Sequence, residues 1–166
     1  RGDPPKQVAW FAEAGKGAWL RRDVDAEDAF PLAPRNTRLD LVRVMQLCLG
    51  DVRVEPTRPD VYAGYTANAP AKVHNVDRQK AAVKFDAVFP TDDADTNREI
   101  ARTIGMLEIE SEAVERFSEK LTDCWNLSSS VQDDIHYLIV LSRLPGERTK
   151  SMTDSTAAAP SFLHMK

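Results

Sequence analysis

The segment SVQDDIHYLIVLSRL, residues 130 to 144, most constrains the fold, because it reads as a helix that is apolar on most sides. A helix on the surface of a small domain needs only one apolar stripe, so such a helix must be covered by other elements. Residues 37 to 49 show the same property. From Leu39 onward, only Asp40, Arg43 and Gln46 interrupt the apolar side chains, on one arc of about 120° at ~100° per residue. Two such segments predict inner helices enclosed by stacked neighbours.

Helix-start and helix-end residues divide the remainder of the chain into further helices. One is expected to begin after Asp3 and to end near Gly15, and a shorter one is expected at residues 77 to 88, before Phe89-Pro90. Thr96 followed three residues later by Glu99 is typical of a capping box, which predicts the start of the next helix. Ser111 and Ser130 are the expected starts of the two helices after that, and Gly105 lies inside a helix, where glycine often allows a close neighbour.

Residues 51 to 75 have no helical periodicity and contain three prolines. We expect an irregular arm there, inserted between helices, since long loops of this kind are often functional or disordered. Tyr62 and Tyr65 lie in this arm and are candidates for anchoring a partner, because tyrosine is enriched at binding hot spots. The alternative is that the two rings attach the arm to the helices.

The last third of the chain has the spacing of a helical repeat. Its helices are joined by short links, so neighbours in sequence should pack antiparallel. Ile100 and Ile135 are 35 positions apart, which is close to the length of one helical hairpin repeat. The inner helix of each hairpin in a stack is covered on most sides. We therefore predict an all-α fold, an α-solenoid of stacked helical hairpins, with a closed helical bundle as the rival, and treat residues 1 to 166 as one domain.

Composition narrows the class of function. The net charge is −4 and no cluster of Lys and Arg occurs, which argues against binding to nucleic acid. No apolar run approaches ~20 residues, so we expect no membrane span. Cys48 and Cys124 lie in apolar helical stretches, are expected to be buried thiols, and form no CxxC or CxxCH motif. The sequence begins at Arg1 rather than Met, and we expect a fragment of a longer protein.

The run from FDAVFPTDDADTNREIARTIGMLE through SEAVERFSEKL to DDIHYLIVLSRL resembles HEAT-like repeats. In particular it resembles the helical region of large exported bacterial proteins that also carry a β-propeller and a c-type haem domain. The matching elements are Phe89-Pro90, Asn97-Arg98-Glu99 and Ile135-His136-Tyr137, and the similarity covers about residues 83 to 144.

What the resemblance implies is a scaffold that connects domains or docks a protein partner, in an exported protein. The haem of such proteins is held by a CxxCH motif in a separate domain, and that motif is absent here, so haem binding is not carried over. The resemblance offers this segment no catalytic residue, cofactor or metal. We therefore predict a non-catalytic interaction module whose partner is another protein or a neighbouring domain.

The candidate interaction surface consists of polar residues on the two apolar helices. Gln132, His136 and Arg143 lie within about 40° on the helical wheel at ~100° per residue. We predict that they share a concave face with Asp40, Arg43 and Gln46. The alternatives are a merely solvated strip, or a His136 that is hydrogen-bonded to a neighbouring helix.

Two metal patterns are weaker. Asp133 and His136 are three residues apart, but one pair does not make a metal site, which needs three or four ligands. Asp93, Asp95 and Asn97 match only the first half of a calcium loop, so we interpret these acids as stabilising a helix N-terminus.

Two other classes of function stay open. One is the accessory domain of an enzyme with a polar cleft around His136, which requires more polar side chains to converge on that residue. The other is a helical bundle that oligomerises through its apolar helices.

Overall fold

The computed structural model describes residues 33–51, 64–66, 74–124, 129–146, 148–150 and 152–157. Throughout these residues the chain is helical or irregular and contains no strand, which confirms the all-α class. The main helices are α3 (Arg35–Cys48), α4 (Asn75–Val88), α5 (Ala94–Leu107), α6 (Glu112–Asp123) and α7 (Val131–Arg143). A short helical stretch follows at 152–157. None of the helices in the described part is both long and apolar enough to span a bilayer.

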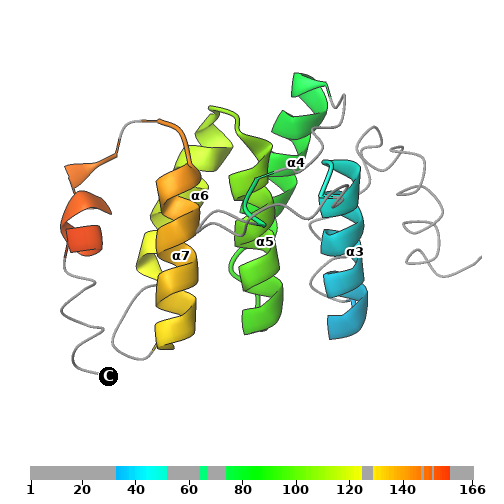
Figure 1. Ribbon diagram of the computed structural model, residues 1–166, viewed down its shortest axis with the longest axis horizontal. Helices are drawn as coiled ribbons and strands as arrows, with labels where there is room; N and C mark the ends of the chain where they lie inside the picture. Colours follow the sequence, from blue (N-terminus) through cyan, green and yellow to red (C-terminus); the bar gives the residue numbers. More distant parts are fainter. Residues whose placement is uncertain are drawn as a thin grey trace, which may run out of the picture.

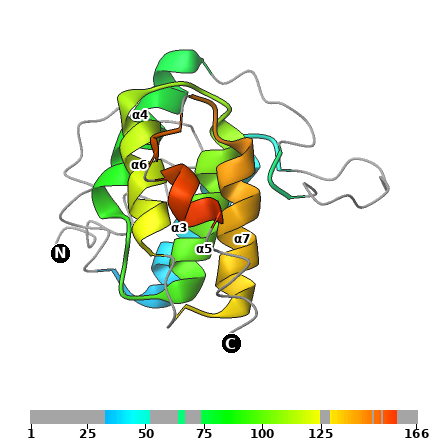
Figure 2. The same ribbon diagram turned by 90° about the vertical axis from the view of Figure 1, so that its left-hand side faces the viewer.

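The helices form two layers. Helices α3, α5 and α7 lie side by side in one layer and run in the same direction, while α4 and α6 lie behind them and run the opposite way (Figure 1). The view turned by 90° shows the same separation into layers (Figure 2). Consecutive helices from α4 to α7 are therefore antiparallel, as their short links predicted.

Helix α5 is the most enclosed of these helices. It contacts α3 on one side, α7 on the other and α4 in the second layer. Eight of its residues are buried. Helix α7 has four buried residues, and its Val131 and Ile135 are 42% and 49% exposed.

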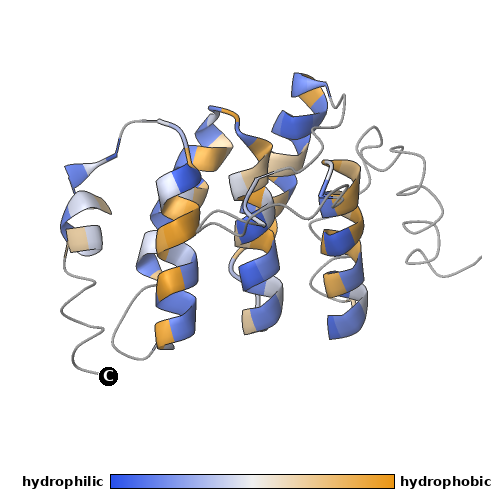
Figure 3. Ribbon diagram, in the orientation of Figure 1, coloured by the Kyte–Doolittle hydropathy of each residue, from blue (hydrophilic) through white to orange (hydrophobic). Residues whose placement is uncertain are grey.

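Our expectation that residues 130 to 144 and 37 to 49 are the helices covered on most sides was therefore wrong. Within the described residues α3 and α7 are the two outer members of the front layer, and each has α5 on one side only. Leu47 of α3 is correspondingly 56% exposed. Figure 3 shows the result: hydrophobic residues face outward on α7, whereas the same side of α5 is largely hydrophilic.

Side-chain caps begin three of the helices. Ser111 and Ser130 accept hydrogen bonds from the backbone N–H groups of Val114 and Asp133, as predicted for α6 and α7. The predicted capping box at Thr96 was wrong, because α5 begins earlier, at Ala94. Its cap is Asp93, whose carboxylate accepts from the N–H and the hydroxyl of Thr96.

Helix α3 has no side-chain cap. The sequence favours Thr37 or Asn36 as its cap, but the helix begins earlier, at Arg35 after Pro34. The expected short helix at 77 to 88 is α4, which begins slightly earlier at Asn75 and ends before Phe89-Pro90 as predicted. Its residues Ala81, Ala82 and Phe85 face the core, again as expected.

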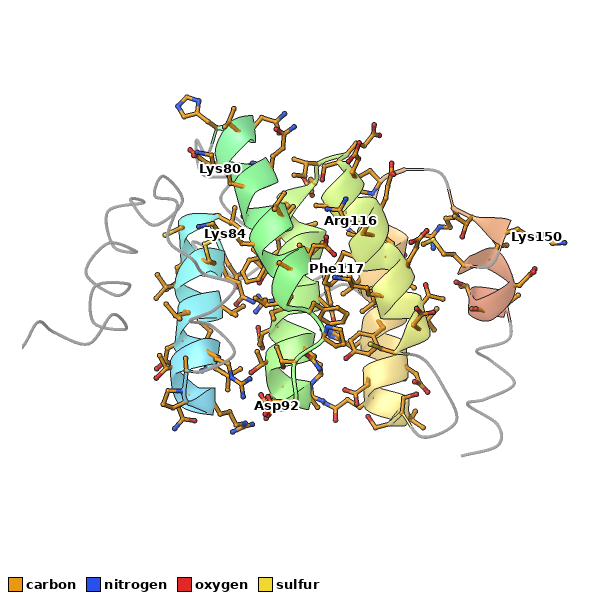
Figure 4. The ribbon with its side chains drawn as sticks, turned by 180° about the vertical axis from the view of Figure 1, so that it is seen from behind. Lys80, Lys84, Asp92, Arg116, Phe117 and Lys150 are labelled. Atoms are coloured by element: carbon orange, nitrogen blue, oxygen red, sulfur yellow. The ribbon has the colours of Figure 1, made fainter. Side chains whose placement is uncertain are left out.

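The apolar core lies between the two layers. Phe117 of α6 is fully buried, and its ring lies 4.5 Å from that of Phe89, centroid to centroid. Figure 4, from the side of α4 and α6, shows Phe117 between these two helices. The buried carboxylate of Asp86 on α4 binds Arg116 and Lys120 of α6, each at 2.9 Å. An apolar contact and a charged contact thus hold the second layer together.

Replacing Gly105 with alanine should raise the free energy of unfolding by about 0.5–1 kcal/mol, because glycine weakens a helix interior by this amount. A methyl group at Gly105 would lie 3.9 Å from Arg143 Cβ and from Val140 Cγ1, which is ordinary contact distance. Urea denaturation followed by circular dichroism measures the change.

Gly64→Ala is the matched control, since Gly64 has a φ of +91°, a conformation that alanine adopts only with strain. We expect no gain there. A loss of stability in Gly105→Ala would mean that α5 and α7 pack more closely than the structure shows.

Candidate functional site

The polar side of α5 holds a cluster of hydrogen-bonded and charged residues around Arg102. Its members, which we call the Arg102 cluster, are Gln46 and Asp51 from the end of α3, Gly64 from the segment 64–66, and Glu99 and Arg102 from α5. Arg102 pairs with Asp51 and with Glu99, the latter at 3.4 Å. It also donates to Gln46 Oε1 at 3.1 Å and to the carbonyl oxygen of Gly64. One guanidinium therefore joins three separate parts of the chain.

Gln46 contributes to the same cluster from inside the α3–α5 contact. Its side-chain NH2 donates to Glu99 Oε2 at 2.8 Å and to Thr103 Oγ1 at 3.1 Å. The residue is only 3% exposed. Our expectation that Gln46 belongs to a solvent-exposed strip was therefore wrong. The amide is buried because α5 supplies a partner for both its oxygen and its nitrogen.

A second cluster surrounds His136 on the side of α7 that faces α5. His136 Nε2 lies 2.9 Å from the backbone oxygen of Arg98, and Nδ1 lies 2.7 Å from the hydroxyl of Tyr65. A carbonyl oxygen can only accept, so Nε2 carries the proton and Nδ1 accepts from Tyr65. The Tyr65 and His136 rings lie 5.3 Å apart. Beside them Arg98 binds Asp133 at 2.6 Å and also pairs with Asp95.

Burial sets the protonation state of this cluster. It lowers the pKa of His136, and the neighbouring Arg98 charge acts in the same direction, while the bond to the Arg98 carbonyl and the charges of Glu99 and Asp133 oppose the shift. Burial likewise raises the pKa of Tyr65. His136 is therefore a neutral imidazole near pH 7, with both ring nitrogens engaged.

The structure brings together only part of the predicted interaction surface. Gln46, Tyr65 and His136 all converge on the polar side of α5. Asp40, Arg43 and Gln132 are exposed and are not members of either cluster. Arg143 lies at the other end of α7 and binds Glu108 at 2.6 Å. Tyr62 lies outside the described residues, as do most of the predicted arm and the expected first helix.

Sequence reasoning missed the residues that organise these clusters, above all Arg98 and Arg102. The signal was present, because Asp95, Arg98, Glu99 and Arg102 recur at spacings of three and four residues, which places them on one face of a helix. Asp51, the partner of Arg102, follows the end of α3, and no helical spacing of charged residues marks it in the sequence.

The acidic residues of the two weaker metal-binding patterns form hydrogen bonds and ion pairs with other side chains. Asp133 binds Arg98 and Ser130, and Asp93 and Asp95 both pair with Arg35. Across the described ranges, no group of three or more His, Cys, Asp or Glu side chains is placed to hold a metal ion. Cys48 and Cys124 are half-buried rather than fully buried, and burial raises the pKa of both thiols.

The cap of α5 predicts an acid-sensitive contribution to stability. Burial alone would raise the pKa of Asp93, but hydrogen bonds from Thr96 and Arg35 outweigh it and lower the pKa to about 2, from 3.8. A carboxyl group with a lowered pKa in the folded state stabilises fully above its unfolded pKa, and the contribution is lost as pH falls between these two values. We expect the wild type to lose more stability than Asp93→Asn over this interval.

Thermal unfolding of both proteins between pH 5 and pH 2 measures this difference. Asparagine is also a good cap, so the helix start is retained while the titrating group is removed. All other carboxyl groups are common to both proteins. Parallel loss of stability in the two would show that Asp93 does not carry the effect.

Comparisons of the chain with models of protein families, with curated proteins and with solved structures found no match.

Proposed function

We propose that this chain is a non-catalytic helical-repeat scaffold, a HEAT-like stack of helical hairpins that serves as an interaction module of a larger exported protein. The observation that carries the proposal is the arrangement of the helices. Alternate helices α3, α5 and α7 share one layer and one direction, while α4 and α6 share the other (Figure 1). Stacked hairpins have this arrangement, because each inner helix packs on the inner helix of the next repeat.

The positions of the buried residues in α5 and α7 support the proposal that these helices belong to successive repeats. Ile100, Thr103 and Ile104 are buried in α5, and Tyr137, Val140 and Leu141 are buried in α7. The spacing within each set is the same. Each set begins seven positions after its cap, Asp93 or Ser130. Corresponding positions of the two helices therefore carry corresponding core contacts.

The polar side chains of the two clusters bind one another across α3, α5 and α7, which supports a structural role for them. Arg98 and Arg102 of α5 are both paired with carboxylates from other elements. His136 uses both ring nitrogens to connect α7 with α5 and with Tyr65. These groups hold α3, α5, α7 and the segment 64–66 in fixed relation, which is what a scaffold requires. The assignment to an exported parent protein rests on the family resemblance of residues 83 to 144.

Native-state hydrogen exchange with two variants tests the stacked arrangement. Leu141→Ala weakens the core at α7, and Val42→Ala weakens it at α3; both side chains are buried. In a stack each repeat depends on its neighbours, so Leu141→Ala should speed amide exchange in α7 and α5 more than in α3. Val42→Ala should show the reverse. An equal change in every helix for both variants would indicate a closed bundle with one shared core.

Site-specific photo-crosslinking tests the interaction module. A photoreactive residue at exposed Gln132, in the layer with the polar clusters, should capture a protein partner in cells. The same residue at Val83, which is 48% exposed in α4 of the opposite layer, is the control. Equal capture from both positions, or none from Gln132, would contradict a docking role for the layer of α3, α5 and α7.

A further inference from the structure

The segment Gly64–Tyr65–Thr66 lies on the front layer and is attached to it at two points. Arg102 of α5 donates to the carbonyl oxygen of Gly64, and its guanidinium packs beneath that glycine. Tyr65 donates its hydroxyl to His136 Nδ1 of α7 at 2.7 Å. The first contact involves an arginine, which keeps its charge at every relevant pH. The second involves a histidine that must be neutral to accept this hydrogen bond.

The tautomer of His136 follows from its two partners. Its Nε2–H is directed at the Arg98 carbonyl oxygen, so only Nδ1 has a lone pair for the Tyr65 hydroxyl. A proton added to His136 must therefore go to Nδ1, the atom that holds Tyr65. Nδ1 then becomes a donor, so the Tyr65 hydroxyl can no longer donate to it and has to accept instead, and a positive charge is buried beside the tyrosine ring.

We propose that protonation of His136 releases the segment Gly64–Tyr65–Thr66 from α5 and α7, so that this contact is an acid-sensitive latch on the polar face of the front layer. One proton is taken up at Nδ1, Tyr65 can no longer donate to that atom, and no other bond to hydrogen changes; the cost of burying the charged ring favours release. Release uncovers the Arg102 cluster and His136 to solvent. The latch is a property of the chain itself and does not depend on the proposed scaffold function.

The charges that face His136 act in opposite directions. Arg98 on α5 opposes a further positive charge, while Glu99 on α5 and Asp133 on its own helix favour it. Arg98 and Asp133 bind each other, as do Arg102 and Glu99, so much of their effect on His136 cancels. Tyr65, contributed by the segment itself, and Tyr137, the ring neighbour at 5.5 Å, are neutral across this range. Burial of the ring between α5, α7 and Tyr65 is therefore the deciding contribution.

The sign of the pH dependence follows by linkage. The pKa of His136 is lowered in the docked state, and in the released state, where water reaches the ring, it returns toward its ordinary value of 6.5. The released state binds the proton more tightly, so acidification shifts the equilibrium toward release. Docking is fully favoured above the released-state pKa and weakens as pH falls below it. The upper end of this window, the ordinary pKa of histidine, lies above the ordinary pKa values of Asp and Glu, about 3.9 and 4.3.

Nuclear magnetic resonance of the full chain tests the latch. The ring signals of Tyr65 and the Hε1 signal of His136 are followed between pH 7.5 and pH 5. We expect Tyr65 to move from its docked to its released position with the same midpoint as the titration of His136. In His136→Gln, which has no titrating ring, the Tyr65 signals should not change across this range. Titration of His136 while Tyr65 stays docked, or an unchanged transition in His136→Gln, would overturn the proposal.

If protonation of His136 weakens docking of the segment, then docking of the segment must also lower the pKa of His136. This relation provides a second test, in which only His136 is observed. In Tyr65→Ala the latch is removed, so the pKa of His136 should shift upward. An unchanged pKa of His136 in Tyr65→Ala would show that the segment does not control protonation, and the latch would be excluded.

Discussion

Phe117→Ala should lower the free energy of unfolding by about 3–5 kcal/mol, the largest single loss that we expect in the described part of the chain. The side chain of Phe117 is fully buried, and its ring packs on Phe89 between the two layers. Truncation removes the buried ring and leaves a cavity that the surrounding helices fill only in part. Because the ring belongs to a core cluster formed by residues of both layers, the loss should affect the whole unit rather than α6 alone.

Denaturant unfolding followed by far-ultraviolet circular dichroism measures this effect. Val83→Ala is the control, because Val83 is exposed on α4, and a surface substitution of this kind usually changes stability by less than about 0.5 kcal/mol. If Phe117→Ala and Val83→Ala had similar effects, Phe117 would not occupy the core position that the structure assigns to it.

Arg102→Ala should lower the free energy of unfolding by about 1–3 kcal/mol. Breaking a fully buried pair costs about 3–5 kcal/mol, and the partial exposure of this one reduces the figure. The side chains of Arg102 and Asp51 are 23% and 17% exposed. The substitution leaves the carboxylates of Asp51 and Glu99 without their shared cation. It also removes the donor to Gly64, so the segment 64–66 should become more accessible to hydrogen exchange.

A double-mutant cycle with Asp51→Asn isolates the Arg102–Asp51 contribution. Arg102→Lys should restore only part of the stability, because one ammonium group cannot reproduce the fork that reaches Asp51, Gln46 and Gly64 together. Arg43→Ala on the exposed side of α3 is the matched control and should be nearly neutral. Independent effects of Arg102→Ala and Asp51→Asn would show that this ion pair contributes nothing measurable.

The sequence predicted the helices well where the signal was local. Ser111 and Ser130 begin α6 and α7, and Phe89-Pro90 follows the end of α4, because caps and proline act within one turn. Even a local signal gave one wrong prediction, the cap of α5. Two candidates for the cap of α5 lie three residues apart, and Asp93 takes the position rather than Thr96. Its carboxylate accepts both the N–H and the hydroxyl of Thr96 and pairs with Arg35.

The functional side chains were harder to predict, as Gln46 and His136 illustrate. Both were recognised as polar residues on apolar helices and were assigned to an exposed strip, although a hydrogen bond from His136 to a neighbouring helix was the stated alternative and is the one observed. The structure places Gln46 inside a contact and gives His136 a partner on each ring nitrogen. The polar residues of an apolar helix can face solvent or a polar partner on another helix, and periodicity is the same in both cases.

By itself the sequence determined that the chain is helical, where most helices begin and end, and which helix faces are apolar. These properties depend on residues within a few positions of one another. Only the tertiary structure decided that α5, rather than α3 or α7, is the enclosed helix, and that Arg102 and His136 join distant segments. Enclosure depends on how many neighbours a helix has in space, and an ion pair such as Arg102–Asp51 depends on two residues that the fold alone brings together.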